Sequence, residues 1–332
     1  MTRKKDWIST LLIAACILAI LACSAYLLYN YLYLPRKIQA QNARYASLYA
    51  PLGTPGVSAS AVSSPAAPEI TEPAPSHVIT AEPSPTQVPE IAEIDDIPIV
   101  NDVLRDVAYG TPGPDTIIYA APTPPPSQES FADLLALNPE TVGFLRLGDI
   151  ALPVVQRLND NTFYLEHNFE GGESAAGCVF LDGVNRLYPP DPCLYVYGHN
   201  MKNGTMFGNL TEFCRLDSIK QNPIVRFDSI YRDGEYAPFA CFALTADRSA
   251  SDFFELRSFV FTEESFVEYA AELKTRSQIM IPIDVKYGDE LLILVTCNYS
   301  INDGRFVLAC RRLRDGETEN TIRALVGQSQ PN

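Results

Sequence analysis

The hydrophobic and polar positions divide the chain into three parts. Residues 7–34 form an apolar run that contains no Lys, Arg, Asp or Glu. Residues 35–127 are rich in Pro, Ala, Ser, Thr and Glu and show no regular apolar spacing. From residue 128 onward, short apolar runs alternate with turn residues, a pattern typical of a folded domain rich in β-strands.

The third part predicts a mainly β domain with few helices. Helical spacing of apolar residues predicts a short helix that starts at Ser130 and a long one over residues 263–276. Eight short β-prone runs predict strands at 151–156, 177–181, 194–197, 224–228, 236–244, 280–283, 291–296 and 306–311. Eight such strands in one domain predict a closed barrel or a sandwich.

The first part predicts an uncleaved transmembrane anchor at residues 7–34, preceded by a cytoplasmic tail at residues 1–6. The run exceeds the ~20 residues that a membrane helix needs. Trp7 and several tyrosines suit the two interfaces, and Pro35 ends the segment. A cleaved signal peptide would be shorter and followed by small residues. A lipoprotein would turn polar after Cys23, but the apolar run continues.

The orientation of this anchor follows from its flanks only weakly. Basic residues lie on both sides, at residues 3–5 and at residues 36, 37 and 44, so the positive-inside count is nearly balanced. The very short N-terminal tail favours a cytoplasmic N-terminus. We therefore expect a single-pass membrane protein whose C-terminal domain is extracellular.

The second part, residues 35–127, predicts a disordered spacer, because it cannot bury enough apolar surface to offset the entropy of ordering. Such a segment can hold a domain far from the bilayer, which suits a Gram-positive cell wall. The predicted organisation is completed by a folded domain at residues 128–316 and a C-terminal tail at residues 317–332.

Charge and cysteine usage narrow the function. The net charge of −15 and pI near 4.6 argue against nucleic acid as the main partner. Three histidines and the absence of a Cys-x-x-Cys motif predict no metal site, and no cofactor is predicted either. We expect no disulfides. Setting Cys297 aside leaves five cysteines in the domain, so at least one is unpaired within the chain. Cys178, Cys241 and Cys310 lie in apolar runs, where a free cysteine packs as a small hydrophobic residue.

Three residues carry the candidate chemistry. Cys297 ends one apolar run, a turn-rich loop with Asn302 and Asp303 follows, and Arg305 opens the next run. Two such runs predict neighbouring antiparallel strands that bring Cys297 and Arg305 to one end of a sheet. A cysteine nucleophile reacts as the thiolate and needs a donor for the oxyanion. His199, just after a predicted strand, is the expected general acid and base.

The other two histidines are weaker candidates. His77 lies in the predicted spacer, and His167 is interpreted as a hydrogen-bonded loop residue.

Residues 131–313 resemble the sortases, and class B sortases in particular. The resemblance rests on the following blocks: Asn138-Pro-Glu-Thr-Val-Gly-Phe, Pro153-Val-Val-Gln, Asp160-Asn-Thr-Phe-Tyr-Leu-Glu-His-Asn-Phe, Tyr197-Gly-His-Asn-Met-Lys-Asn-Gly-Thr-Met-Phe, and Leu294-Val-Thr-Cys followed by Gly304-Arg. The histidine block and the Thr-Cys…Arg block are highly specific together. Ile293 departs from the family pattern, which has Thr there; it should tune packing beneath the loop and leave the nucleophile assignment intact.

The resemblance implies a sortase-type closed eight-stranded β-barrel with N-terminal helices and one long inserted helix. It also implies a cysteine transpeptidase that acts on proteins with a C-terminal sorting signal. Cys297 would form a thioester, His199 would protonate the leaving amine, and Arg305 would stabilise the oxyanion. Asn200 and Thr296 are assigned to substrate binding, with an ordinary strand-end role as the alternative for Thr296. An amine of peptidoglycan or its precursor would accept the acyl group.

Alternatives remain open at this point. A pilin-polymerising sortase would use a lysine of a pilin as the acceptor. An exported cysteine endopeptidase would hydrolyse, although such enzymes usually place Cys before His in the chain. A non-catalytic binding domain would not need Cys, His and Arg together. We expect residues 247–261 to shape the substrate groove, but neither the sorting motif nor the acceptor follows from the sequence.

Overall fold

The computed structural model describes residues 3–49, 123–298 and 304–332, except the side chains of residues 3–10, Cys297 and Asn298. Most of the predicted spacer, His77 and the turn residues Asn302 and Asp303 therefore lie outside the described residues.

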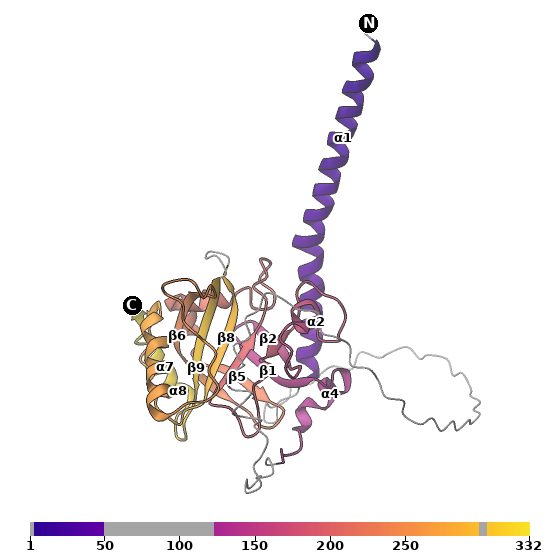
Figure 1. Cartoon of the computed structure of the whole chain (residues 1–332). Helices are drawn as coiled ribbons and strands as arrows, with labels where there is room; N and C mark the ends of the chain where they lie inside the picture. Colours follow the sequence, from indigo (N-terminus) through magenta and orange to yellow (C-terminus); the bar gives the residue numbers. More distant parts are fainter. Residues whose placement is uncertain (1–2, 50–122, 299–303) are drawn as a thin grey trace, which may run out of the picture. The chain divides into compact units, whose positions relative to one another are not determined.

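In the described part of the chain, eight strands close into a barrel in the order β1-β2-β3-β4-β8-β9-β6-β5. This confirms the predicted eight-stranded closed barrel. Its strands are β1 (Thr141–Leu147), β2 (Ile150–Val155), β3 (Val179–Leu181), β4 (Cys193–Tyr197), β5 (Val225–Ser229), β6 (Glu235–Thr245), β8 (Leu291–Asn298) and β9 (Gly304–Arg312). Figure 1 shows β8 and β9 as neighbouring arrows, with β6 beside β9.

Two strand pairs of the barrel are parallel, β2 with β3 and β4 with β8, and the other neighbours are antiparallel. Parallel partners end at the same edge of a sheet. The parallel β4–β8 pair therefore brings the C-terminal ends of two strands that are distant in sequence to one edge.

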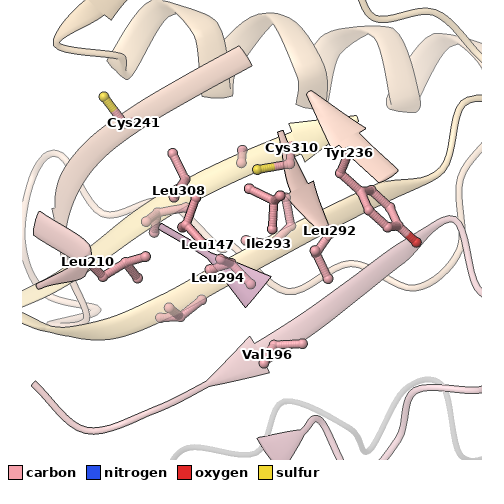
Figure 2. Close-up of a cluster of buried hydrophobic side chains, with 14 of the residues drawn as sticks. Leu147, Val196, Leu210, Tyr236, Cys241, Leu292, Ile293, Leu294, Leu308 and Cys310 are labelled. Carbon is pink, nitrogen blue, oxygen red and sulfur yellow. The ribbon is translucent and has the colours of Figure 1, made fainter. Parts of the chain in front are cut away.

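Apolar side chains from all eight strands form the core of the barrel. Figure 2 shows part of this core, with Leu147 of β1 and Val196 of β4 near β8 and β9. Ile293 of β8 and Leu308 of β9 are fully buried within it. Ile293, the departure from the sortase pattern, thus packs in the core, on the strand that carries Cys297.

The predicted long helix is confirmed as α7 (Glu263–Arg276), which packs against β6. Thr262 caps its first turn and accepts a hydrogen bond from the Ser265 backbone. The predicted helix at residue 130 is present as the 3₁₀ turn η2 (Glu129–Phe131) followed by α4 (Ala132–Leu137). Three short helical elements were not predicted: α5 (Phe163–Glu166), α6 (Leu216–Gln221) and α8 (Glu319–Val326).

One predicted strand has a different role. Residues 280–283 were expected to form a barrel strand, but only β7 (Ile279–Met280) forms there, and it pairs with β10 (Gln330–Pro331) outside the barrel. The eighth barrel strand is β1, which follows the break at Pro139. Its burial is nearly continuous instead of alternating, so its sequence lacks the period of two that marks a half-exposed strand.

The N-terminal segment is helical from α1 (Arg3–Leu28) through the π-helical turn η1 (Tyr29–Tyr33) to α2 (Leu34–Leu48). From residue 11 it is long and apolar enough to cross a membrane. The prediction that Pro35 ends the helix and opens the spacer is wrong. Pro35 directly follows this π-helical turn, in which the Leu34 amide donates to the Tyr29 carbonyl, so the hydrogen bond that proline cannot donate is missing at an irregular turn of the helix.

Helix α2 belongs to the folded domain because it packs on β2. Tyr45 and Tyr49 are both 3% exposed, and their rings lie on Phe169 and on Phe131 and Phe144. We call this cluster the second core; its buried members are Tyr45, Tyr49, Phe131, Leu134, Phe144, Val155, Tyr164, Phe169, Cys178 and Phe180.

The predicted tail at residues 317–332 also differs from the structure. Thr318 caps α8, and Ile322 and Val326, four residues apart, are fully buried against the barrel core. Strand β10 then pairs with β7. The folded domain therefore continues beyond residue 316, because Ile322 and Val326 lie on one face of α8 and pack against the barrel core.

Candidate active site

Four strand ends meet at one edge of the barrel. β4, β6 and β8 end there, and β9 begins there. The registers Tyr197↔Val295, Asn298↔Gly304 and Thr245↔Gly304 align these ends. The edge therefore gathers backbone from three distant parts of the sequence, because β8 and β9 follow each other in the chain.

Cys297 and Arg305 are direct partners in the antiparallel β8–β9 pair, as the sequence analysis predicted. Directly opposed residues in such a pair have Cα atoms about 4.5–5.5 Å apart. Arg305 is half-buried and donates a hydrogen bond of 3.1 Å to the Gly304 carbonyl. The Arg305 backbone thus lies opposite Cys297 on the neighbouring strand.

His199 reaches the same edge from β4. The Gly198 amide donates to the Val295 carbonyl at 3.2 Å, which completes the parallel β4–β8 pairing at Tyr197↔Val295. His199 follows Tyr197 by two residues, and Cys297 follows Val295 by two residues. The backbone therefore brings all three predicted catalytic residues to one edge.

The imidazole of His199 is held by a backbone carbonyl. Its Nε2 lies 2.7 Å from the Leu165 carbonyl oxygen at the end of α5. A carbonyl oxygen can only accept, so Nε2 carries the hydrogen of this bond. No sequence motif predicts this contact, because the acceptor is a backbone carbonyl and not a side chain.

Gly177 makes room for this arrangement. It has φ +59°, and a Cβ there would lie 2.5 Å from the Tyr164 carbonyl oxygen and 3.1 Å from His199 Cδ2. A side chain at this position would push the imidazole and the α5 backbone apart. The requirement for glycine is therefore both conformational and steric.

The loop after His199 folds back on the histidine. The amides of Met201 and Phe207 both donate to the His199 carbonyl. Asn200 is half-buried and forms a backbone bridge with Met206. The 3₁₀ turn η3 (Leu210–Cys214) follows this loop.

Thr296 connects the nucleophile strand to the histidine loop. Its hydroxyl is buried and donates a 2.6 Å hydrogen bond to the Gly198 carbonyl. This bond ties the residue before Cys297 to the residue before His199. The hydroxyl thus supports the loop; substrate contact by Thr296 and Asn200 stays a prediction.

His167 and Cys178 have contacts or burial that indicate a structural role. His167 is hydrogen-bonded through Nδ1 to the Phe163 carbonyl and stacks on the Phe163 ring at 3.9 Å, the loop role that was expected. Burial raises the pKa of the Cys178 thiol to about 12, which makes it a poor nucleophile. No cluster of three potential metal ligands occurs among the described residues.

The segment between β6 and α7, expected to shape the groove, is pinned to the barrel by a buried ion pair. Arg257 lies 2.9 Å from the carboxylate of Asp182, which is fully buried. The Tyr197 hydroxyl donates to the same carboxylate at 3.0 Å, two residues before His199. Sequence reasoning missed Asp182 and Arg257, which are 75 residues apart in the chain.

Comparison with known proteins now gives the family. No family model matches the chain. Sortase B of Listeria monocytogenes is 30% identical over 173 residues, which cover 52% of this chain and 68% of that protein. Sortase B of Staphylococcus aureus is 25% identical over 188 residues, which cover 55% of this chain and 75% of that protein.

The fold agrees with these relatives. The crystal structure of Clostridium perfringens sortase B superposes with a TM-score of 0.50 at 29% identity, covering 55% of this chain and 98% of that one. The matched part corresponds in extent to the barrel domain, so the N-terminal third of the chain contributes little to the likeness. The chain belongs to the class B sortase family and is a sortase-type cysteine transpeptidase.

Proposed function

We propose that this protein is a membrane-anchored transpeptidase that cleaves a C-terminal sorting signal through a thioester on Cys297. It then transfers the protein to an amine of the cell wall or of its precursor. The observation that carries the proposal is the backbone register at the barrel edge, Cys297 opposite Arg305 and His199 following β4 beside β8. Staphylococcus aureus sortase B has been solved in complex with a substrate.

In the first step, the Cys297 thiolate attacks the carbonyl before the scissile bond. The oxyanion of the tetrahedral intermediate is stabilised by Arg305. The carbon–nitrogen bond breaks as His199 gives its proton to the leaving amine, and the acyl group remains on sulfur.

In the second step, the acceptor amine attacks the thioester carbonyl. His199 takes the proton that the amine loses, an amide bond forms, and the Cys297 thiolate leaves. Because Leu165 holds Nε2, we assign the transferred proton to Nδ1 of His199. Arg305 serves both tetrahedral intermediates.

The N-terminal helix supports the membrane part of the proposal. It is long and apolar enough to span a bilayer, and α2 continues it directly onto the barrel. With a cytoplasmic N-terminus the catalytic domain is extracellular, where both the exported substrate and a membrane-borne wall precursor are accessible.

The test uses the full chain in detergent micelles with peptides that carry Asn-Pro-x-Thr-type or Leu-Pro-x-Thr-type signals. Oligoglycine, diaminopimelate-type or lysine-containing amines are added in separate reactions. Mass spectrometry should find an acyl adduct on Cys297 and an amine-ligated product. Cys297→Ala should abolish both, while Cys214→Ala, which removes a half-buried free thiol, should abolish neither.

The outcomes separate the alternatives. Ligation only to the lysine peptide would make the protein a pilin polymerase. Hydrolysis that no amine diverts would make it an endopeptidase. The absence of an adduct with any peptide would contradict the proposed sorting-signal chemistry.

A further inference from the structure

The block Asn138-Pro-Glu-Thr contacts none of the reacting groups, yet its side chains are ordered around one hydroxyl. We propose that Asn138, Glu140 and Tyr164, here called the tyrosine anchor, position the Leu165 carbonyl that holds the His199 imidazole. They are positioning residues for the general acid and base, so the inference rests on the proposed function.

The Tyr164 hydroxyl uses both its donor and an acceptor site within the anchor. It donates to Glu140 Oε2 at 2.5 Å and accepts from Asn138 Nδ2 at 2.9 Å. The same amide donates to the Phe169 carbonyl at 2.6 Å, and the Tyr164 side chain is 3% exposed. The ring therefore has one orientation.

Glu140 is itself fixed from two sides. Arg157 donates to both of its carboxylate oxygens, at 3.0 and 3.2 Å, and the Glu140 amide donates to Asn138 Oδ1. Burial opposes ionisation, but the hydrogen bonds from Arg157 and Tyr164 outweigh it and lower the pKa of Glu140. The anchor thus presents a carboxylate to the tyrosine at neutral pH.

Helix α5 depends on this anchor because it is only four residues long. A single helical turn is not stable by itself. Asp160 caps its start by accepting from the amides of Thr162 and Phe163, and the Tyr164 carbonyl accepts from the Cys178 amide. Besides the Asp160 cap and the Arg157 contact with the Phe163 ring, the buried Tyr164 ring holds this turn, one residue before the Leu165 carbonyl.

The consequence for His199 follows from hydrogen-bond chemistry. In catalytic triads a third group holds the histidine in one tautomer and one orientation, and its loss lowers the rate. Here a neutral carbonyl takes that place at 2.7 Å from Nε2. A displaced α5 would remove the preference for hydrogen on Nε2.

The test is Tyr164→Phe in the full chain in detergent micelles, because this change removes one oxygen and keeps the packing of the ring. Histidine side chains are labelled with ¹⁵N; with three histidines in the chain, His167→Gln and His199→Gln assign the signals. At a pH where the imidazoles are neutral, wild-type His199 should carry its hydrogen on Nε2. The variant should show a mixed tautomer signal.

Kinetics give the second readout. Tyr164→Phe should lower kcat for peptide cleavage about 10-fold, a fraction of what loss of a triad member costs, and leave KM within about twofold. Glu140→Gln keeps an acceptor for the hydroxyl and should retain most of the activity and the tautomer. Tyr188→Phe, at an exposed tyrosine outside the anchor, should behave as wild type.

An unchanged tautomer signal in Tyr164→Phe would overturn the inference, whether or not the rate falls. So would a rise in KM at constant kcat, which would indicate a role in substrate binding. The tautomer measurement needs no substrate. If the wild-type protein forms no thioester, the proposed function fails while the anchor is still judged by the imidazole signal.

Discussion

The two ends of strand β9 carry arginines in opposite surroundings. Arg311, at the end away from the candidate site, is fully buried and donates two hydrogen bonds to Glu317, at 2.7 and 2.8 Å. Arg305, six residues earlier, is half-buried and donates to a backbone carbonyl, and within the described residues no carboxylate pairs with it. One guanidinium is committed to the fold, whereas the other keeps donors for a ligand.

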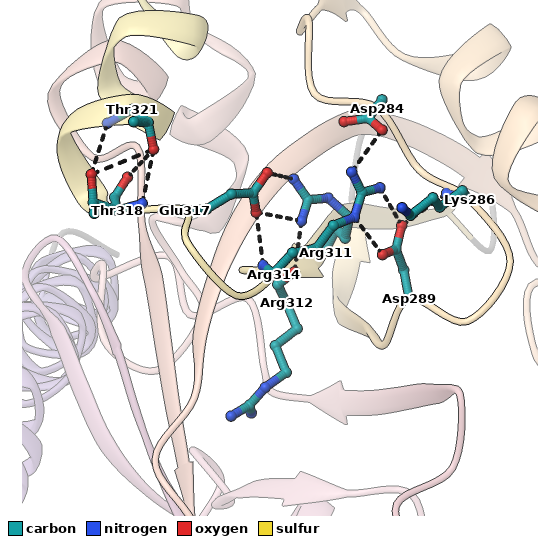
Figure 3. A network of polar contacts seen from close by, with 9 residues as sticks. All are labelled: Asp284, Lys286, Asp289, Arg311, Arg312, Arg314, Glu317, Thr318 and Thr321. Carbon is teal, nitrogen blue, oxygen red and sulfur yellow. Dashed lines mark hydrogen bonds and ion pairs between the residues drawn. The ribbon is translucent and has the colours of Figure 1, made fainter.

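The committed end is a network, shown in Figure 3. Arg314 lies 2.7–2.8 Å from carboxylate oxygens of both Asp289 and Asp284, and its own amide donates to Glu317. These contacts join the end of β9 to the loop before β8 and to the start of α8. The difference teaches that the same residue type stabilises the barrel at one end and is left available at the other.

The largest expected effect is at the available end. Arg305→Lys keeps the charge but loses the planar fork of donors, so we expect kcat to fall by about 10²–10³, the usual cost of an oxyanion donor. The midpoint of thermal unfolding should stay within about 2 °C, because no carboxylate among the described residues depends on Arg305. Peptide cleavage and thermal melts measure the two. A large loss of stability would refute the contrast.

The mirror change is Arg311→Met at the committed end. The change removes both side-chain hydrogen bonds to Glu317, which keeps only the bond from the Arg314 amide, and should destabilise the fold by about 3 kcal/mol. Urea unfolding measures this loss, and cleavage per folded molecule should be unchanged at low temperature. Arg323→Met, which removes an exposed pair with Glu319, is the matched control and should cost less than about 1 kcal/mol. Equal losses for both arginines would contradict the role of burial.

A smaller effect is expected where the fold supports the site. Thr296→Val removes the hydroxyl that donates to the Gly198 carbonyl at 2.6 Å, at a cost of about 1–2 kcal/mol. Because this bond ties β8 to the His199 loop, kcat should fall about 10-fold, while Thr296→Ser should keep most of it. Peptide cleavage assays on the two variants measure this difference in kcat. If Ser and Val behave alike, the hydroxyl is not what holds the loop.

These contrasts also show what the sequence could predict. The barrel, helix α7 and the β8–β9 pairing follow from local signals, namely apolar runs, a capping residue and a turn-rich loop. The candidate Cys297, His199 and Arg305 follow from residue types that recur in cysteine chemistry, and the structure brings their backbones to one edge.

What the sequence could not predict is held by distant contacts. The Leu165 carbonyl has no side-chain signature, and the Asp182–Arg257 pair joins residues that no local pattern relates. Helix α2 was assigned to the spacer because Pro35 and a polar composition outweighed its few apolar positions. The role of these positions is visible only in the folded structure, where Tyr45 and Tyr49 pack within the second core.

The smallest expected effect is the pH dependence of stability at the committed end, which comes from Glu317. The hydrogen bonds from Arg311 lower the pKa of Glu317 in the folded protein, whereas an unfolded glutamate titrates near its ordinary value of about 4.3. The pair therefore contributes its full stability above that value, and the contribution is lost as the pH falls through the lower folded pKa. Glu317→Gln should be less stable at neutral pH and lose less stability on acidification than wild type. Urea unfolding of wild type and Glu317→Gln between neutral and acidic pH measures both effects. Parallel curves for wild type and Glu317→Gln would mean that Arg311 does not depend on a charged partner, and the committed end would then owe its stability to packing alone.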